Sequence, residues 1–114
     1  MNKLLGMIGL AKRAGKLVSG SEAVLESIHN KKAKAVYICA DASDNTKKKF
    51  CDSCKYYGIE YCILSVMMTE LSSAIGKMGN IAAVCISDEE MNKAVRKAAI
   101  MDGGCVYGSS TDEK

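Results

Sequence analysis

Three short, mostly apolar runs constrain what this chain can fold into. They span residues 35–40, 59–64 and 81–86. Runs of this length between turn signals are typical of strands that are buried on both faces of a sheet. Segments with apolar residues at helical spacing lie between and around these runs, and such alternation indicates helices packed on both faces of one sheet. The sequence therefore predicts an α/β fold, a three-layer α/β/α sandwich with a mostly parallel or mixed sheet.

Element boundaries follow from periodicity and from helix start and stop signals. Glycines at positions 15, 58 and 76 are suited to end three helices, because glycine readily adopts the left-handed conformation. Ser87 and Glu90 have the spacing of a capping box and predict the start of the last helix. The expected helices span 2–14, 20–29, 44–57, 67–75 and 88–100, and the expected strands span 17–18, 35–40, 59–64 and 81–86.

The stretch from Gly15 to Glu22 reads as a helix stop, a short strand and the start of a second helix. Ser19 and Glu22 have the Ser-x-x-Glu spacing of a capping box. The first free amides of this helix should lie beside Gly20, where no side chain blocks a ligand. With Lys16 close in the sequence, such a helix start suits an anionic partner such as RNA. Most capped helix starts bind nothing, so this signal alone is weak.

The chain of 114 residues has room for one domain. We expect this domain to span residues 1–101 and the Gly/Ser-rich stretch 102–114 to form a flexible tail. No run of 18 or more apolar residues is present, which argues against a membrane span. The apolar N-terminus is followed directly by Lys12 and Arg13 without a small-x-small cleavage site, so a cytoplasmic location is the favoured interpretation.

Positive charge is concentrated in the first half of the chain. Residues 1–55 hold 11 basic and five acidic residues, whereas residues 56–114 hold five basic and eight acidic ones. The whole chain carries a formal charge of +3. This asymmetry is compatible with a basic face for nucleic acid. The alternative is that the charges only cover solvated helix faces.

The cysteines do not predict a disulfide framework. Cys39, Cys62 and Cys85 lie inside apolar runs, where a free thiol behaves as a small hydrophobic side chain. Cys51 and Cys54 have the spacing of a redox or metal pair, but they fall in the middle of a predicted helix and lack two further ligands. Core packing is their favoured role, with metal or redox chemistry as the alternative.

No motif of an enzyme is present. The glycines near residue 15 do not have the P-loop spacing. The one histidine, His29, stands at a helix end, where a solvated or capping role is favoured over catalysis. Five Tyr and one Phe give little support for base stacking of the single-strand type. We therefore expect no catalytic residues, no metal and no cofactor.

Residues 17–28 (LVSGSEAVLESI) and 32–41 (KAKAVYICAD) resemble, in this order, the ribosomal-protein superfamily of the L7Ae and L30e type, which recognises RNA kink-turns. Residues 9–15 and 41–49 are most similar to its bacterial YlxQ-like members. The resemblance covers about Leu4 to Val95. It implies a four-stranded α/β/α sandwich and a non-enzymatic RNA-binding protein.

In that superfamily the second helix begins with the motif Gly-x-Asn/Lys-Glu/Gln, whose polar side chains reach tandem G·A pairs. Here Gly20 matches the glycine, while Glu22 and Ala23 stand at the two polar positions and Glu26 stands at the place of a later lysine. The resemblance also implies RNA contacts from the turn before the third helix and from the loop before the last strand. Together with Lys16, which lies near the helix start, the predicted RNA-binding residues are Gly20, Ser21, Glu22, Ala23, Ser43, Asn45, Lys48, Lys77, Met78, Gly79, Asn80 and Ile81.

The leading hypothesis is a ribosome-associated protein that binds kink-turn-like structured RNA, with ribosomal RNA and the ribosome as partners. No membrane and no small-molecule substrate are expected. A protein-interaction module on the same fold is the alternative, which Ala23 and Glu26 favour because they remove polar or basic contacts. A thiol oxidoreductase that uses Cys51 and Cys54 is a third hypothesis.

Overall fold

In the computed structural model, helices and strands alternate along the chain. The structure describes residues 3–64, 66–77, 79–101 and 106–108. The helices are α1 (Lys3–Arg13), α2 (Ser21–His29), α3 (Asp44–Tyr57), α4 (Met68–Ala74) and α5 (Glu89–Met101). The strands are β1 (Leu17–Ser19), β2 (Ala35–Cys39), β3 (Glu60–Leu64), β4 (Ala83–Ile86) and β5 (Val106–Gly108). The predicted elements are thus confirmed in kind and order, and α3 has the predicted bounds.

The strands form one mixed sheet in the order β1-β4-β2-β3-β5. Strands β2 and β3 are parallel, and the other neighbouring pairs are antiparallel. The α/β/α sandwich with a mixed sheet is confirmed, and β5 adds a short strand to the four that were expected. Residues 106–108, which lie within the stretch predicted to form a flexible tail, pair with β3. Residues 102–105 and 109–114 of that tail lie outside the described residues.

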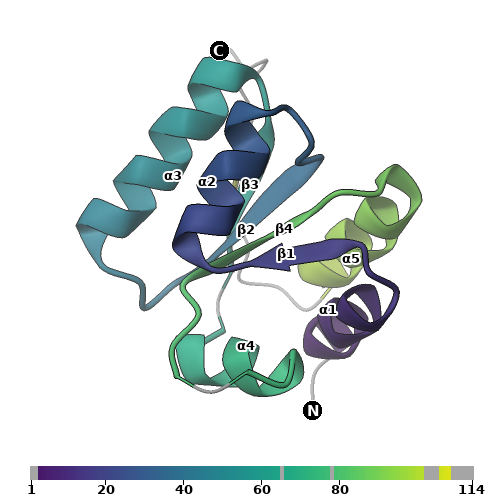
Figure 1. Ribbon diagram of the computed structural model, residues 1–114. Coiled ribbons are helices and arrows are strands. Elements are labelled where there is room, and N and C mark those ends of the chain that lie inside the picture. The colour runs from purple at the N-terminus through teal and green to yellow at the C-terminus, as the bar shows by residue number, and fades with distance from the viewer. Residues whose placement is uncertain (1–2, 65, 78, 102–105, 109–114) are drawn as a thin grey trace.

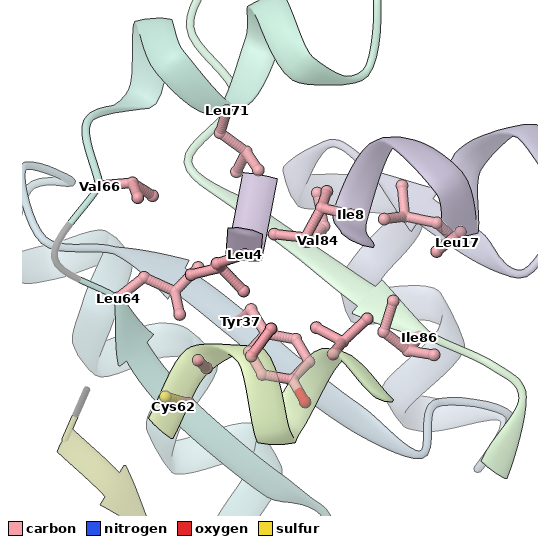
Figure 2. Packing of buried hydrophobic residues seen from close by; sticks show 14 of the residues in the cluster. Leu4, Ile8, Leu17, Tyr37, Cys62, Leu64, Val66, Leu71, Val84 and Ile86 are labelled. Atoms are coloured by element: carbon pink, nitrogen blue, oxygen red, sulfur yellow. The ribbon is translucent and has the colours of Figure 1, made fainter. Parts of the chain in front are cut away.

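Helices cover both faces of the sheet, as the ribbon in Figure 1 shows, with α2 and α3 on one face and α1, α4 and α5 on the other. Strand β2 is buried along its whole length and sends alternate side chains to the two faces. Tyr37 lies in the core under α1 and α5, among the side chains drawn in Figure 2. Val36 and Ile38 lie in the core under α2 and α3. The side chains of this continuous apolar run thus pack into the hydrophobic cores on both faces of the sheet.

A buried hydrogen bond ties the sheet to α5. The Tyr37 hydroxyl donates to Asn92 Oδ1 at 2.7 Å, and both residues are buried. The pairing satisfies both polar groups, which removes the penalty of burying them alone. Burial raises the pKa of the Tyr37 hydroxyl, so the hydroxyl stays protonated and remains a donor.

Both predicted capping boxes are wrong in detail. Ser19 pairs with Val84 in the sheet, so the N-cap of α2 is Gly20 and has no side-chain cap. Ser87 is likewise not the cap of α5. Asp88 takes that place, since its Oδ2 accepts from Met91 N at 2.9 Å. In both cases a long-range pairing of the preceding residue moves the helix start by one position.

The free cysteines among the described residues are Cys39, Cys51, Cys54 and Cys85. Cys39, Cys54 and Cys85 are buried, which confirms the packing role predicted for them. Cys62 is also in the core but is disulfide-bonded, so the interpretation as a free thiol is wrong at that position. None of the helices in the described part of the chain combines the length and the apolar character needed to cross a membrane.

Candidate nucleic-acid interface

The start of α2 is open, as the sequence predicted. It lacks, however, the side-chain cap that was expected from Ser19. Gly20 has φ 99° and ψ 142°, a conformation that residues with a Cβ rarely adopt. The first helical amide with a backbone partner is that of Val24, which donates to Gly20 O at 2.9 Å. The helix start has no side-chain cap, and a Cβ at Gly20 would meet no atom within 4 Å. The amides of residues 21–23 thus follow a residue with open space around its Cβ position and are not capped by a side chain.

The turn between β2 and α3 lies beside this helix start. Ser43 is the N-cap of α3, and its Oγ accepts from Thr46 N at 3.2 Å. Asn45 is exposed in the first turn of the helix. In the same turn, Asp41 Oδ1 accepts from Met68 N at 2.9 Å and so caps α4. The contact between Asp41 and Met68 thus joins the turn before α3 to α4, the helix that precedes the α4–β4 loop.

The third segment is the loop between α4 and β4. Its backbone is held at Ile81 from two sides. Ile81 N donates to Ser72 Oγ at 2.9 Å, and Ile81 O accepts from Cys39 Sγ at 3.6 Å. Ser72 in turn donates to Met68 O at 2.9 Å, which fixes its hydroxyl. The loop is thereby anchored at its end, whereas Lys77, Gly79 and Asn80 are exposed.

The sheet register brings the three segments to one end of the molecule. Ser19 at the end of β1 pairs with Val84, and Ile38 near the end of β2 pairs with Ala83. Cys39 N donates to Ala82 O at 2.8 Å, which continues this contact towards the loop. In Figure 1 the start of α2, the start of α3 and the α4–β4 loop lie on the same side. We call residues 20–23, 40–45 and the described residues of 76–81 the strand-end surface.

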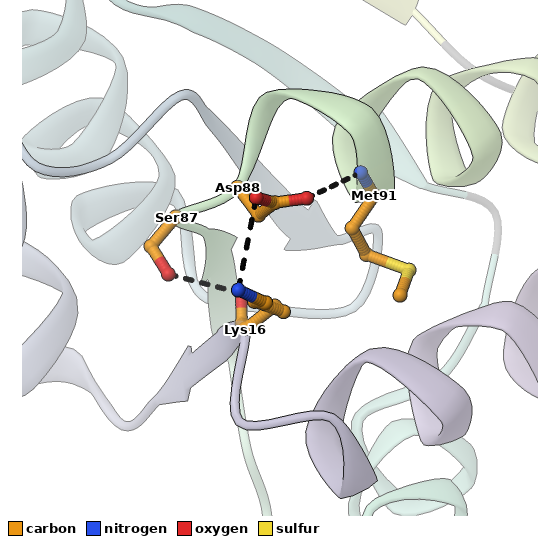
Figure 3. Close-up of polar contacts among 4 residues, drawn as sticks. All are labelled: Lys16, Ser87, Asp88 and Met91. Carbon is orange, nitrogen blue, oxygen red and sulfur yellow. Dashed lines mark hydrogen bonds and ion pairs between the residues drawn. The ribbon is translucent and has the colours of Figure 1, made fainter.

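Lys16 does not belong to the strand-end surface. Its carbonyl accepts from Ser87 N at 2.9 Å and from Ser87 Oγ at 3.2 Å, and its Nζ lies 3.8 Å from Asp88 Oδ1 (Figure 3). These contacts fix it at the start of β1, and a strand of this length separates it from Gly20 by about 13 Å. The sequence distance of four residues hid this separation, because the intervening residues are extended.

Lys48 lies one turn beyond the start of α3 and is exposed. It forms an ion pair with Asp52 at 3.2 Å, and both side chains are largely exposed. Such a pair contributes little to stability and exchanges readily for another anion. Ile81 is half-buried against the core under α1. Met78 lies outside the described residues.

Charge at the strand-end surface is mixed rather than uniformly basic. Glu22 is exposed in the first turn of α2, where a carboxylate interacts favourably with the helix dipole. Asp44 likewise lies in the first turn of α3. Lys77 supplies positive charge from the loop. Binding here would therefore depend on hydrogen bonds and shape as much as on net charge.

The Cys51–Cys54 pair lies in the middle of α3, as predicted, and away from any helix start. Burial raises the pKa of the Cys51 thiol. Burial, together with the neighbouring Cys51 and Cys85, raises the pKa of Cys54 to about 12. A thiol of raised pKa is a poor nucleophile and a poor metal ligand at neutral pH. Among the described residues, no three His, Cys, Asp or Glu side chains gather in a way that would hold a metal ion.

Alkylation tests the packing role of this pair. The thiolate is the species that reacts, and Cys54 is fully buried with a pKa of about 12. At pH 8 we expect iodoacetamide to modify Cys54 about a thousandfold more slowly in the folded protein than in urea. Peptide mass spectrometry over time measures both rates. Rapid modification of Cys54 in the folded protein at pH 7 would contradict a buried, protonated thiol.

A groove of about 570 Å³ lies between α1 and α4. None of the predicted RNA-binding residues that the structure describes lines it. Its walls are formed by Leu5, Gly6, Gly9, Arg13, Thr69, Glu70, Ser73 and Ala74. The groove and the strand-end surface are thus different parts of the molecule.

Comparison with known proteins gives the family of this chain. The model of the Ribosomal protein L7Ae/L30e/S12e/Gadd45 family matches residues 2–97. The chain belongs to this family. It is 45% identical over 75 residues to the RNA-binding protein YlxQ of Enterococcus faecium, covering 66% of this chain and 72% of that protein. It is 37% identical over 89 residues to the RNA-binding protein YlxQ of Bacillus subtilis strain 168, covering 78% of this chain and 88% of that protein. The resemblance to YlxQ-like members is thereby confirmed.

Two solved structures superpose well on this chain. A protein of unknown function from Bacillus halodurans has a TM-score of 0.79 at 29% identity, over 88% of this chain and 99% of that one. The Giardia lamblia 15.5kD RNA binding protein has a TM-score of 0.70 at 19% identity, over 86% of this chain and 82% of that one. The second similarity shows the fold alone.

Sequence reasoning missed the residues that hold the strand-end surface together. Ser72 and Cys39 fix Ile81, and Asp41 caps α4. A serine at an otherwise apolar position of α4 was a weak signal for Ser72, since buried hydroxyls need a partner. Cys39 and Asp41 act across 42 and 27 residues of sequence, where no local pattern reports the contact.

Proposed function

We propose that this protein binds structured RNA of the kink-turn type through the strand-end surface, in the cytoplasm and in association with the ribosome. The supporting observation is the convergence of three separate segments around a helix start that has no side-chain cap and no Cβ at Gly20. The names of the two YlxQ relatives support RNA as the ligand. The role is binding, not catalysis.

Each segment has a chemical task in this proposal. The amides at the start of α2 donate to phosphate or base-edge acceptors, aided by the positive end of the helix dipole. Asn45 offers an amide side chain from the first turn of α3, and Asn80 offers one from the loop. Lys77 neutralises phosphate. The anchored Ile81 holds the loop at a fixed distance from the helix start.

Titration of two RNA duplexes tests this function. One carries a kink-turn with its tandem G·A pairs, and in the other those pairs are replaced by Watson–Crick pairs. We expect tighter binding of the first by at least about tenfold, because only that RNA presents the bent shape and the sheared base edges. Equal binding of both duplexes would contradict kink-turn recognition and would indicate binding through positive charge alone. Co-sedimentation with ribosomal subunits tests the ribosomal part separately.

Two lysine variants locate the RNA on the surface. Lys77→Ala removes an exposed cation from the strand-end surface, so we expect weaker binding and a salt dependence lower by about one charge. Lys16→Ala removes a cation that is paired with Asp88 at the other end of β1, so affinity should stay unchanged. Weaker binding by Lys16→Ala together with unchanged binding by Lys77→Ala would place the RNA at the Lys16 end of β1 and would contradict binding at the strand-end surface.

A protein-interaction surface is the second candidate. Glu22, Ala23 and Glu26 are exposed on the outer side of α2, and they give RNA no cation and few hydrogen-bond donors. If the kink-turn duplex does not bind, partners retained from a nuclease-treated lysate and lost with Glu22→Lys would favour this candidate.

A further inference from the structure

Three rings gather at the far ends of α2 and α3, away from the strand-end surface. The rings of His29 and Tyr57 have centroids 5.2 Å apart and are tilted by 42°. The rings of Tyr56 and Tyr57 lie 4.9 Å apart, edge to face at 80°. His29 is the last residue of α2 and Tyr57 the last of α3, so the cluster joins the ends of two neighbouring helices. We call it the aromatic patch.

The patch has one anchored ring and two exposed ones. Tyr57 is half-buried and packs against the core under α2 and α3. Tyr56 is 82% exposed, although it is a large aromatic side chain. His29 is also exposed. If these rings served only the core, they would be buried. A half-buried ring flanked by two exposed rings instead suits a partner that stacks on the exposed ones.

Three lysines lie close to these rings in the sequence. Lys31 and Lys32 follow His29 after one residue, Asn30, and Lys55 precedes Tyr56. All three are exposed, and none of them takes part in an ion pair given by the described residues. These three cations are therefore available to an anionic partner without first breaking an ion pair given by the described residues.

The backbone holds two of these lysines in place. Lys31 N donates to Ile28 O at 3.0 Å and Lys32 N donates to Ser27 O at 2.9 Å, which closes the end of α2. Lys31 has φ 59°, a left-handed conformation that favours glycine at this position of a helix end. A lysine here costs stability relative to glycine, so its cation is present at the expense of backbone strain.

Helix dipoles account for part of the charge. Cations near the ends of helices interact favourably with the last carbonyl groups. That interaction explains lysines, but it does not explain an exposed tyrosine edge-to-face with a second ring and a histidine. Sites that bind single-stranded nucleic acid combine aromatic rings, on which the bases stack, with cations that contact the phosphates. Polyanionic protein would need the cations but not the rings.

We propose that the aromatic patch binds single-stranded RNA that flanks the structured element, with bases stacked on Tyr56 and His29 and phosphates near the lysines. The proposal rests on the RNA binding proposed above. Helix α2 is about 13 Å long, a span that a few nucleotides cover. Lys48 and Lys55 are seven residues apart on one face of α3, with Asp52, the ion-pair partner of Lys48, between them.

The experiment compares a kink-turn duplex with and without an oligouridylate extension of about ten nucleotides on either end. We expect the extension to tighten binding by about tenfold, as one stacked base does in other single-strand binders. Tyr56→Ala should abolish this gain and leave the affinity for the duplex without extension unchanged. Tyr56→Phe, which keeps the ring, should retain the gain. The residue is 82% exposed, so both variants should fold.

The possible outcomes distinguish the aromatic-patch proposal from the proposed kink-turn function. If the duplex without extension does not bind, the kink-turn function fails, while Tyr56-dependent binding of free oligouridylate still supports the patch. If the extension adds nothing, or if its gain survives Tyr56→Ala, the patch proposal is overturned. Tyr56-dependent binding of polyglutamate without any binding of oligouridylate would assign the patch to an acidic protein and would also overturn it.

Discussion

Gly9→Ala is expected to lower the free energy of unfolding by about 1–3 kcal/mol, because it places a Cβ 2.9 Å from the carbonyl oxygen of Ala74. That atom belongs to the backbone of α4 and has no rotamer to escape into. The two helices would have to separate, which weakens the packing of Ile8 and Leu71 in the core between them. Urea denaturation followed by circular dichroism measures the change.

Gly6→Ala is the matched control. Gly6 lies on the same helix and in the same groove, but a Cβ there meets no atom within 4 Å. The exchange in the interior of a helix should then stabilise the protein by about 0.5–1 kcal/mol, since alanine loses less backbone entropy than glycine. Opposite signs for the two variants are expected. A stabilising effect of Gly9→Ala would show that α1 and α4 are not in close contact.

The fold followed from the sequence where the signals are local. The apolar run at 35–40 and the glycine at position 58 act within their own segments, and β2 and α3 were placed correctly or within one residue. Strand β4 was expected from Ile81 but begins at Ala83. The reason is a contact outside the strand, because Ile81 N bonds the Ser72 side chain instead of a sheet neighbour.

Long-range pairing explains the other differences. Ser19 has the pattern of a helix cap, yet its pairing with Val84 draws it into β1 and leaves Gly20 as the cap. Strand β5 has three residues and no periodic pattern, so only its pairing with β3 defines it. The aromatic patch was hidden for a similar reason. Few aromatic residues occur in the chain, but the fold brings three of them together from two helices.

For the candidate site, the sequence indicated which segments matter but not how they are held. Gly20 was identified together with its helix start, and the structure gives it the positive φ that only glycine adopts easily. Lys16 was grouped with it by proximity in sequence and lies at the other end of β1. Distances along an extended strand grow by about 3.3 Å per residue, so a short strand is enough to separate two parts of one motif.

Ala23→Gln is expected to raise the affinity for a kink-turn duplex by between about fivefold and about 150-fold, which corresponds to about 1–3 kcal/mol for one bidentate base contact. Ala23 is exposed in the first turn of α2 and has no hydrogen-bonding side chain. A glutamine there supplies the polar group that the motif of related second helices carries. Its amide can donate to and accept from a base edge at the same time. Electrophoretic mobility shift at constant salt measures the change.

Two comparisons decide whether the gain comes from base recognition at this position. Ala14→Gln adds the same side chain to an exposed alanine at the end of α1, beside Lys16, and should leave affinity unchanged. The duplex without G·A pairs should gain nothing from Ala23→Gln, because it lacks the sheared base edges. Stability should change by less than about 0.5 kcal/mol, since alanine and glutamine have similar helix propensity. An equal gain on both duplexes would mean that the side chain contacts the RNA backbone, and Ala23 would then not be what limits kink-turn specificity.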